Sequence, residues 1–99
     1  MSFVTAQPEI IATAAGALQT IGSTMAAGNT AAAAPTTGVI PPAADEVSAL
    51  TAAQFAAQAQ LYQAVSTQAT AIQELFVQAL NTSAASYAAT EAANAIAVD

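Results

Sequence analysis

Residues 35–48 read PTTGVIPPAADEVS, and this stretch separates two long segments with helical patterns. Three prolines and a glycine fall within residues 35–42, which is incompatible with a continuous helix, because proline lacks a backbone donor and clashes with the preceding turn. The stretch therefore predicts a connector over residues 35–44 that turns the chain back. Asp45 is expected to cap a second helix, with Glu46 at the favourable end of its dipole.

The segment before the connector predicts a helix over residues 8–34. Pro8 suits a first helical turn, and the charge of Glu9 complements the positive end of the helix dipole. Apolar or small residues then recur three and four positions apart, which is the spacing of helices packed at a shallow angle. The members of this seam are Ile11, Ala14, Leu18, Ile21, Met25, Gly28 and Ala32. Residues 1–7 are expected to be extended or disordered.

The segment after the connector predicts a second helix over residues 45–81, followed by an alanine-rich tail over residues 82–99. Its large apolar residues form two stripes, and one neighbouring helix can cover only one of them. The first stripe contains Val47, Leu50, Leu61, Val65, Ile72, Leu75 and Ala79, and the second contains Phe55, Tyr62, Ala69, Phe76 and Ser83, with Leu80 and Tyr87 alongside. Glutamines at positions 54, 58, 60, 63, 68, 73 and 78 supply an uncharged polar face.

These patterns predict an all-α fold, an antiparallel two-helix hairpin that leaves apolar surface of its second helix open. Exposed apolar patches usually mark a binding face. The residues expected to form a partner interface are Ile11, Leu18, Ile21, Met25, Phe55, Leu61, Tyr62, Val65, Ile72, Phe76 and Leu80. Periodicity does not separate a different helical partner from a second copy of the same chain, because both would complete a four-helix bundle.

The composition excludes several classes of function. Among 99 residues there are 31 alanines and no Lys, Arg or His, and the net charge is −6. Without cations, nucleic-acid binding and attachment to an anionic membrane surface are not expected. Without His or Cys, no triad-type nucleophile can be activated, and the carboxylates are scattered except for Asp45 and Glu46, which point to different sides of a helix. We therefore expect no enzyme, no metal site and no cofactor.

The sequence also shows neither a secretory signal peptide nor an obvious membrane-spanning segment. The first residues, 1–5, have neither the basic residues nor the apolar block of a secretory signal peptide. No run approaches about 18 consecutive apolar residues, so no membrane-spanning segment is expected. Export, if it occurs, would then proceed without a cleaved leader.

One local pattern near the end of the chain is a pair of functional groups, Tyr87 and Glu91. Residues four apart share one helical face, and only alanines and a threonine lie between these two. Such a pair also arises by chance, so the spacing alone does not distinguish a signal from an incidental pair at a fraying helix end.

Taken together, these residues resemble the PE family of mycobacterial proteins. Pro8 and Glu9 match the dipeptide that names the family, residues 41–48 resemble its interhelical segment, and Tyr87 with Glu91 fits the Tyr-x-x-x-Asp/Glu signal of type VII (ESX) secretion substrates. The similarity runs from about residue 3 to about residue 94. Longer relatives carry extensions beyond this point, so residues 1–99 are expected to form a single PE domain.

The resemblance implies a partner and a destination. PE proteins form heterodimers in which their two helices pack on two helices of a PPE-family protein, which favours a 1:1 hetero-partner over a second copy. A cytosolic ESX secretion chaperone recognises the pair through the PPE subunit, and the pair is exported to the cell envelope or the medium. The chain has no Trp, so the Trp-x-Gly feature that completes the export signal would come from the partner.

Overall fold

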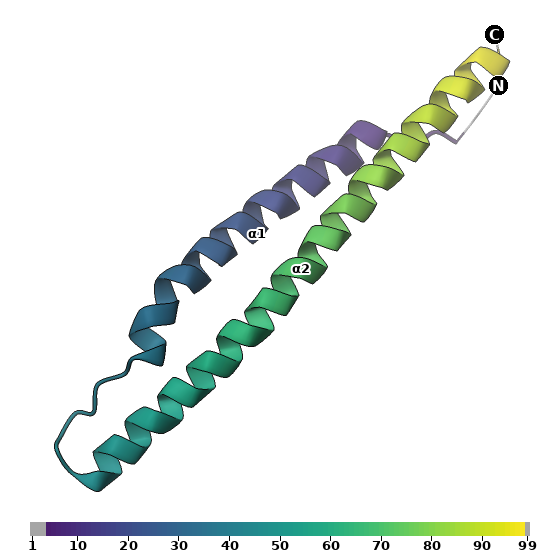
Figure 1. Cartoon of the computed structure of the whole chain (residues 1–99). Helices are drawn as coiled ribbons and strands as arrows, with labels where there is room; N and C mark the ends of the chain where they lie inside the picture. Colours follow the sequence, from purple (N-terminus) through teal and green to yellow (C-terminus); the bar gives the residue numbers. More distant parts are fainter. Residues whose placement is uncertain (1–3, 99) are drawn as a thin grey trace. The chain divides into compact units, whose positions relative to one another are not determined.

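The computed structural model describes residues 4–98 of the chain. These residues form two helices and no strand: α1, Pro8–Thr37, and α2, Glu46–Ala97 (Figure 1). By its contacts the chain divides into two units. The terminal unit comprises Met1–Gly22 and Ile72–Asp99, and the loop unit comprises Ser23–Ala71.

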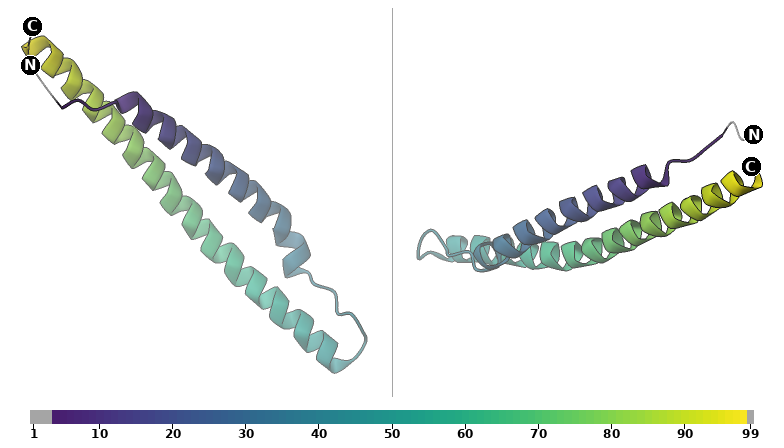
Figure 2. Two further views of the ribbon diagram at one scale, coloured as in Figure 1. Left: turned by 180° about the vertical axis from the view of Figure 1, so that it is seen from behind. Right: turned by 90° about the horizontal axis from the view of Figure 1, so that it is seen from above.

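Within each unit, a segment of α1 lies beside a segment of α2 that runs in the opposite direction (Figures 1 and 2). In the loop unit, residues 38–45 join the two helical segments. In the terminal unit, the Gln73 side chain donates a hydrogen bond from Nε2 to the Leu18 carbonyl oxygen over 2.8 Å. The all-α fold and the antiparallel two-helix hairpin are therefore confirmed.

Helix α1 ends three residues later than expected. The expected helix stopped before Pro35, whereas Pro35 lies inside the last turns of α1. Proline removes one backbone donor, but neighbouring groups satisfy the last carbonyl oxygens of the helix. The Thr36 and Thr37 hydroxyls donate to the carbonyl oxygens of Ala32 and Ala33, and the Gly38 amide donates to Ala34 over 3.0 Å. The connector is accordingly shorter than the expected residues 35–44.

Helix α2 starts where expected and continues much further. Asp45 caps it: the Ser48 amide donates to Asp45 Oδ2 over 3.0 Å, and the Ser48 hydroxyl donates to Oδ1 over 2.6 Å. The helix runs past the expected end at residue 81 to Ala97. Half of the residues from 82 to 97 are alanines and none is proline or glycine, so nothing interrupts the helix.

Residues 4–7 are not helical, in agreement with the expectation for residues 1–7. The other part of that expectation, residues 1–3, lies outside the described residues. Pro8 explains why the helix starts where it does, because the residue before a proline disfavours the α conformation.

The face of α1 that packs on α2 corrects the expected seam. Its least exposed residues between Ile11 and Ala33 are Ile11, Ala15, Leu18, Gly22, Ala26, Asn29, Ala32 and Ala33, so Ile11, Leu18 and Ala32 of the expected seam do lie on it. Ala14, Ile21, Met25 and Gly28 are exposed instead. The expectation followed a strict heptad, whereas contacts along a straight helix of 3.6 residues per turn drift away from a heptad register.

The contact between the helices is built from small residues. The buried hydrophobic residues among those described are Ala15, Ala52, Val77 and Ala84, and no large side chain in residues 4–98 is fully buried. Alanine removes little apolar area from water, so this contact contributes little hydrophobic free energy. Long helices without a large packed face gain most of their stability from further packing.

Helix α1 has a second property that the sequence expectation missed. Within the described residues, it is the one helix long and apolar enough, by length and composition, to cross a membrane. The expectation of no such segment required an uninterrupted apolar run, but scattered Thr, Ser and Gln lower the average hydropathy of α1 only moderately. Helix α1 thus meets the length and average hydropathy of a span without containing the uninterrupted apolar run on which the expectation rested.

Candidate functional site

The large apolar side chains of α2 point to solvent. Seven of them, all those exposed within residues 55–76, are between 53% and 67% exposed: Phe55, Leu61, Tyr62, Val65, Ile72, Leu75 and Phe76. Their spacing explains why they share a broad face, because Phe55, Tyr62 and Phe76 occupy one heptad position, and Val65 with Ile72 occupies the next position around the helix. An apolar surface of this kind can bind another protein by removing it from water.

The side chains of α2 that contact α1 are of a different kind. The least exposed residues of α2 are Ser48, Ala52, Ala56, Ala59, Gln63, Ser66, Thr70, Gln73, Val77, Leu80 and Ala84. We call this set the inner face, and the seven exposed residues above the outer face. Apart from Val77 and Leu80, small and polar side chains therefore contact α1, and most large apolar side chains of α2 are left open.

Two glutamines of the inner face bind the backbone of α1. In the loop unit, Gln63 Nε2 donates to the Asn29 carbonyl oxygen over 3.0 Å. In the terminal unit, Gln73 makes the bond to Leu18 described above, and a Cβ atom at Gly22 would lie 2.6 Å from Gln73 Nε2. Gly22 thus provides the space in which the Gln73 amide reaches α1.

The two glutamines were expected on an exposed polar face and are the functional residues that the sequence reasoning missed. A signal was present: small residues at positions 52, 56, 59, 66 and 70 recur three and four apart, with Gln63 in the same register. The large apolar residues of α2 form a stronger periodic pattern beside it. In physical terms, close approach of two helices requires small side chains, not large ones.

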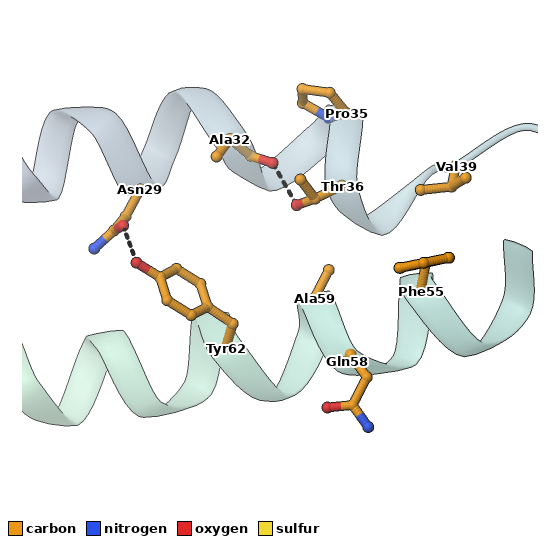
Figure 3. A pocket seen from close by; sticks show the side chains of 9 residues that line it. All are labelled: Asn29, Ala32, Pro35, Thr36, Val39, Phe55, Gln58, Ala59 and Tyr62. Atoms are coloured by element: carbon orange, nitrogen blue, oxygen red, sulfur yellow. Dashed lines mark hydrogen bonds between the residues drawn. The ribbon is translucent and has the colours of Figure 1, made fainter.

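The loop unit contains an open groove of about 500 Å³ beside the outer face (Figure 3). It is lined by Asn29, Ala32, Pro35, Thr36, Val39, Phe55, Gln58, Ala59 and Tyr62. The Tyr62 hydroxyl donates to Asn29 Oδ1 over 2.7 Å, which fixes the phenol ring at one end of the groove. The Phe55 ring faces the α1 side of the groove, whereas the Gln58 amide points away from α1 (Figure 3).

The structure places the eleven predicted interface residues in two groups. Ile11, Leu18 and Leu80 are half-buried where α1 meets α2 in the terminal unit. The other eight are exposed: Ile21, Met25, Phe55, Leu61, Tyr62, Val65, Ile72 and Phe76. Val47, Leu50 and Leu75 are equally exposed on α2 but were not in the predicted set.

Tyr87 and Glu91 lie on regular helix rather than on a frayed tail. The Tyr87 side chain is half exposed. Glu91 is half-buried, and its Oε1 accepts a hydrogen bond from the Ala6 amide over 2.8 Å. Of the family dipeptide, Pro8 is half-buried at the start of α1, and Glu9 is exposed in its first turn.

The charges of the described residues do not gather into a site. No group of three or more His, Cys, Asp or Glu in the described part of the chain could hold a metal ion. The pKa of the Asp45 carboxyl is lowered by the hydrogen bonds from the Ser48 hydroxyl and amide. This carboxyl acts as a helix cap, so its perturbation reports local structure and not chemistry.

Comparison with known proteins points in one direction. The sequence profile of the PE family matches residues 4–94. The PE family protein PE13 of Mycobacterium tuberculosis is 67% identical over 97 residues, which cover 98% of each chain.

Nearly the whole chain is also similar to one part of longer proteins. PE_PGRS36 of Mycobacterium tuberculosis is 60% identical over 95 residues, 96% of this chain but 19% of that protein. PE_PGRS8 of the same organism is 55% identical over 98 residues, 99% of this chain and 56% of that protein. The chain thus spans between about a fifth and just over half of these two relatives. Because the family match covers nearly all of a two-helix chain, the chain belongs to the PE family.

Proposed function

We propose that this chain is a non-enzymatic subunit that pairs lengthwise, 1:1, with a helical protein of the PPE family and completes a four-helix bundle with it. The observation that supports this most is the outer face of α2, where seven large apolar side chains are more than half exposed. Membership of the PE family supports the choice of a PPE protein over other helical partners.

The energetics of the helix pair support the same proposal. Full burial of one large apolar side chain contributes about 1.5–3 kcal/mol, whereas the contact between α1 and α2 buries mainly alanines. Burial of the outer face by a partner would therefore contribute more hydrophobic free energy than burial at the contact between α1 and α2 does. A chain of this kind is expected to depend on its partner for stability.

Co-expression with a candidate PPE protein tests the pairing. The chain is produced alone and with the candidate, and each sample is analysed by light scattering and by thermal unfolding followed by circular dichroism. We expect a soluble 1:1 complex that unfolds cooperatively, and a poorly folded or aggregated chain when it is alone. A monomeric chain that unfolds sharply without a partner would refute the proposal.

We further propose that Tyr87 and Glu91 belong to a type VII export signal, and that the pair reaches the cell surface or the medium. The helical, half-exposed position of Tyr87 supports this, because the side chain is available to another protein. The Trp-x-Gly part of the signal and the contact with the ESX chaperone would come from the PPE subunit, since this chain has no Trp.

The chain contains a second tyrosine that serves as a control for export. Tyr87→Ala is expected to abolish export while the complex still forms. Tyr62→Ala is expected to weaken the complex, because Tyr62 lies on the outer face and bonds to Asn29. Loss of complex formation in Tyr87→Ala would instead make Tyr87 a packing residue.

The alternative is a self-associating helical protein of the cell envelope. The same outer face favours it, because a second copy would also cover the exposed side chains. Light scattering of the chain alone separates the two, since a stable homodimer supports self-association. Binding to liposomes would support an envelope role through the apolar helix α1.

A further inference from the structure

The last turns of α2 extend past the part of the helix that α1 covers. Ala84 is the last buried residue of α2, and of residues 85–98 only Glu91 is not exposed. The chain before α1, residues 4–7, runs along these last turns in the terminal unit (Figures 1 and 2). In that segment only Ala6 is half-buried. The two residues that are shielded are therefore the two that bond to each other.

We propose that the Glu91 carboxylate is a clasp that fixes the segment before α1 to the end of α2. Glu91 Oε1 accepts the Ala6 amide proton over 2.8 Å, and the two residues are 85 positions apart in the chain. The distance is that of a charge-assisted hydrogen bond, which is stronger than a neutral one. The clasp connects the two chain ends directly.

The geometry explains why a tertiary bond is needed at this position. Pro8 prevents the helix from extending upstream, because it disfavours the α conformation at Gln7. The amides of the preceding residues therefore cannot join the α1 ladder and need partners elsewhere. Glu91 supplies one, from the neighbouring helix.

The clasp gives Glu91 a role that does not depend on export. In the proposed signal, Glu91 is a recognition group that pairs with Tyr87. In the clasp, the same carboxylate faces Ala6 and holds backbone. The two roles make different demands: the signal pattern accepts Asp or Glu, whereas the clasp requires the reach of a Glu side chain and only needs an acceptor oxygen.

Amide exchange measured by NMR on the full-length chain tests the clasp, with the chain used as purified together with any partner that travels with it. In the wild type, the Ala6 amide is expected to exchange at least about tenfold more slowly than an unstructured amide. Glu91→Ala is expected to remove this protection. Glu91→Gln should keep much of it, because its amide oxygen still accepts, and Glu91→Asp should lose it, because its carboxylate is one methylene shorter.

Glu74→Ala is the matched control, because Glu74 is an exposed carboxyl of the same helix and the same unit. It should leave the exchange of Ala6 unchanged. Fraying of the end of α2 in Glu91→Ala would show as faster exchange of the amides of residues 92–97. In that case Glu91→Gln and Glu91→Asp are compared, because the clasp predicts that Gln protects the Ala6 amide and Asp does not.

The clasp is refuted if the wild-type Ala6 amide exchanges like an unstructured one, or if Glu91→Ala does not accelerate it. Export of the same variants is scored separately. Normal export of Glu91→Ala would refute the role of Glu91 in the export signal and leave the clasp standing. Export of Glu91→Asp at the wild-type level, with a rapidly exchanging Ala6, would show that the two roles are separable.

Discussion

The two faces of α2 differ in almost every property that matters for packing. The inner face has mainly small residues and glutamines, with Val77 and Leu80, and lies against α1, whereas the outer face has phenylalanines, tyrosine, leucines, isoleucine and valine and lies in solvent. In most soluble helices the large apolar side chains face the interior of the same chain. Here the arrangement is reversed, which supports the proposed contact with another molecule as the place where this apolar area is buried.

The inner face sets the alignment of the two helices, whereas the outer face is the apolar surface available for binding. Hydrogen bonds from Gln63 and Gln73 to α1 carbonyl oxygens are directional, so they favour one alignment of the two helices within each unit. The outer face is less directional, because apolar burial depends mainly on the area removed from water. Within each unit the helix pair is thus aligned by directional bonds, and in the proposed complex the outer face would supply most of the binding energy.

The largest expected effect is on the outer face, in the complex. Phe76→Ala should weaken binding of the partner by about 2–4 kcal/mol, because truncation of a buried aromatic anchor removes both apolar area and packing. The side chain is 54% exposed in the chain alone, so the helicity of the isolated chain should change little. Titration calorimetry of the purified pair measures the first effect, and circular dichroism measures the second.

Gln78→Ala is the control for this variant, because Gln78 is an exposed polar residue two positions further along α2. Its affinity should stay within about 0.5 kcal/mol of the wild type. Equal losses for Phe76 and Gln78 would mean that the outer face has no special role.

The next effect is on the inner side of the hairpin. Ala15 is fully buried, so Ala15→Leu should force the helices apart and destabilise the folded chain by about 1–3 kcal/mol. Ala14→Leu introduces the same side chain one position away, on the exposed surface of α1, and should cost little. Thermal unfolding of both variants, with any partner present at equal concentration, measures the difference. Equal stability would mean that the close contact at Ala15 is not formed.

The sequence predicted the helices but not the contact between them. The prolines at positions 41 and 42 and the cap at Asp45 are local signals, and they located the turn correctly. The inner face depends on which residues allow two backbones to approach, and this is a property of the pair. Of the heptad seam, Ile11, Leu18 and Ala32 lie at the contact, whereas Ile21 and Met25 are exposed and Ala15, outside the seam, is fully buried.

The same difference explains the outcome at the candidate site. Open apolar surface on α2 was expected because its large apolar residues exceed what one neighbouring helix can cover, but members of both predicted stripes are exposed, so α1 covers neither stripe as a whole. The bond between Ala6 and Glu91 could not be predicted, because no periodicity links residues 85 positions apart. The extension of α2 from the expected end at residue 81 to Ala97 was not predicted. The high alanine content of this segment favours helix over a frayed end.

A smaller effect distinguishes three glycines of α1. Gly16→Ala and Gly28→Ala add a methyl group in open space and should stabilise the chain by about 0.5–1 kcal/mol each through helix propensity. At Gly22 the same change meets the Gln73 amide and should displace its bond to Leu18, which offsets the gain by about 1 kcal/mol. Thermal unfolding ranks the three variants, and a full gain at Gly22 would show that the Gln73 bond contributes nothing.

The smallest effect is expected at the start of α2, where Asp45 caps the helix and Ser48 is the first residue of the inner face. Hydrogen bonds from Ser48 lower the pKa of Asp45, so the ionised carboxylate is favoured in the folded chain. A lowered pKa contributes stability that is present above the ordinary pKa and is lost as the pH falls below about 4 and through the folded pKa. In this acidic window the first turn of α2 should fray, while the contacts of the inner face persist. Asp45→Asn keeps a capping oxygen but cannot titrate, so the amide exchange of Ser48 should become independent of pH in this variant after correction for intrinsic exchange. A pH dependence that survives in Asp45→Asn would assign the effect to another carboxyl and remove Asp45 from the account of how α2 begins.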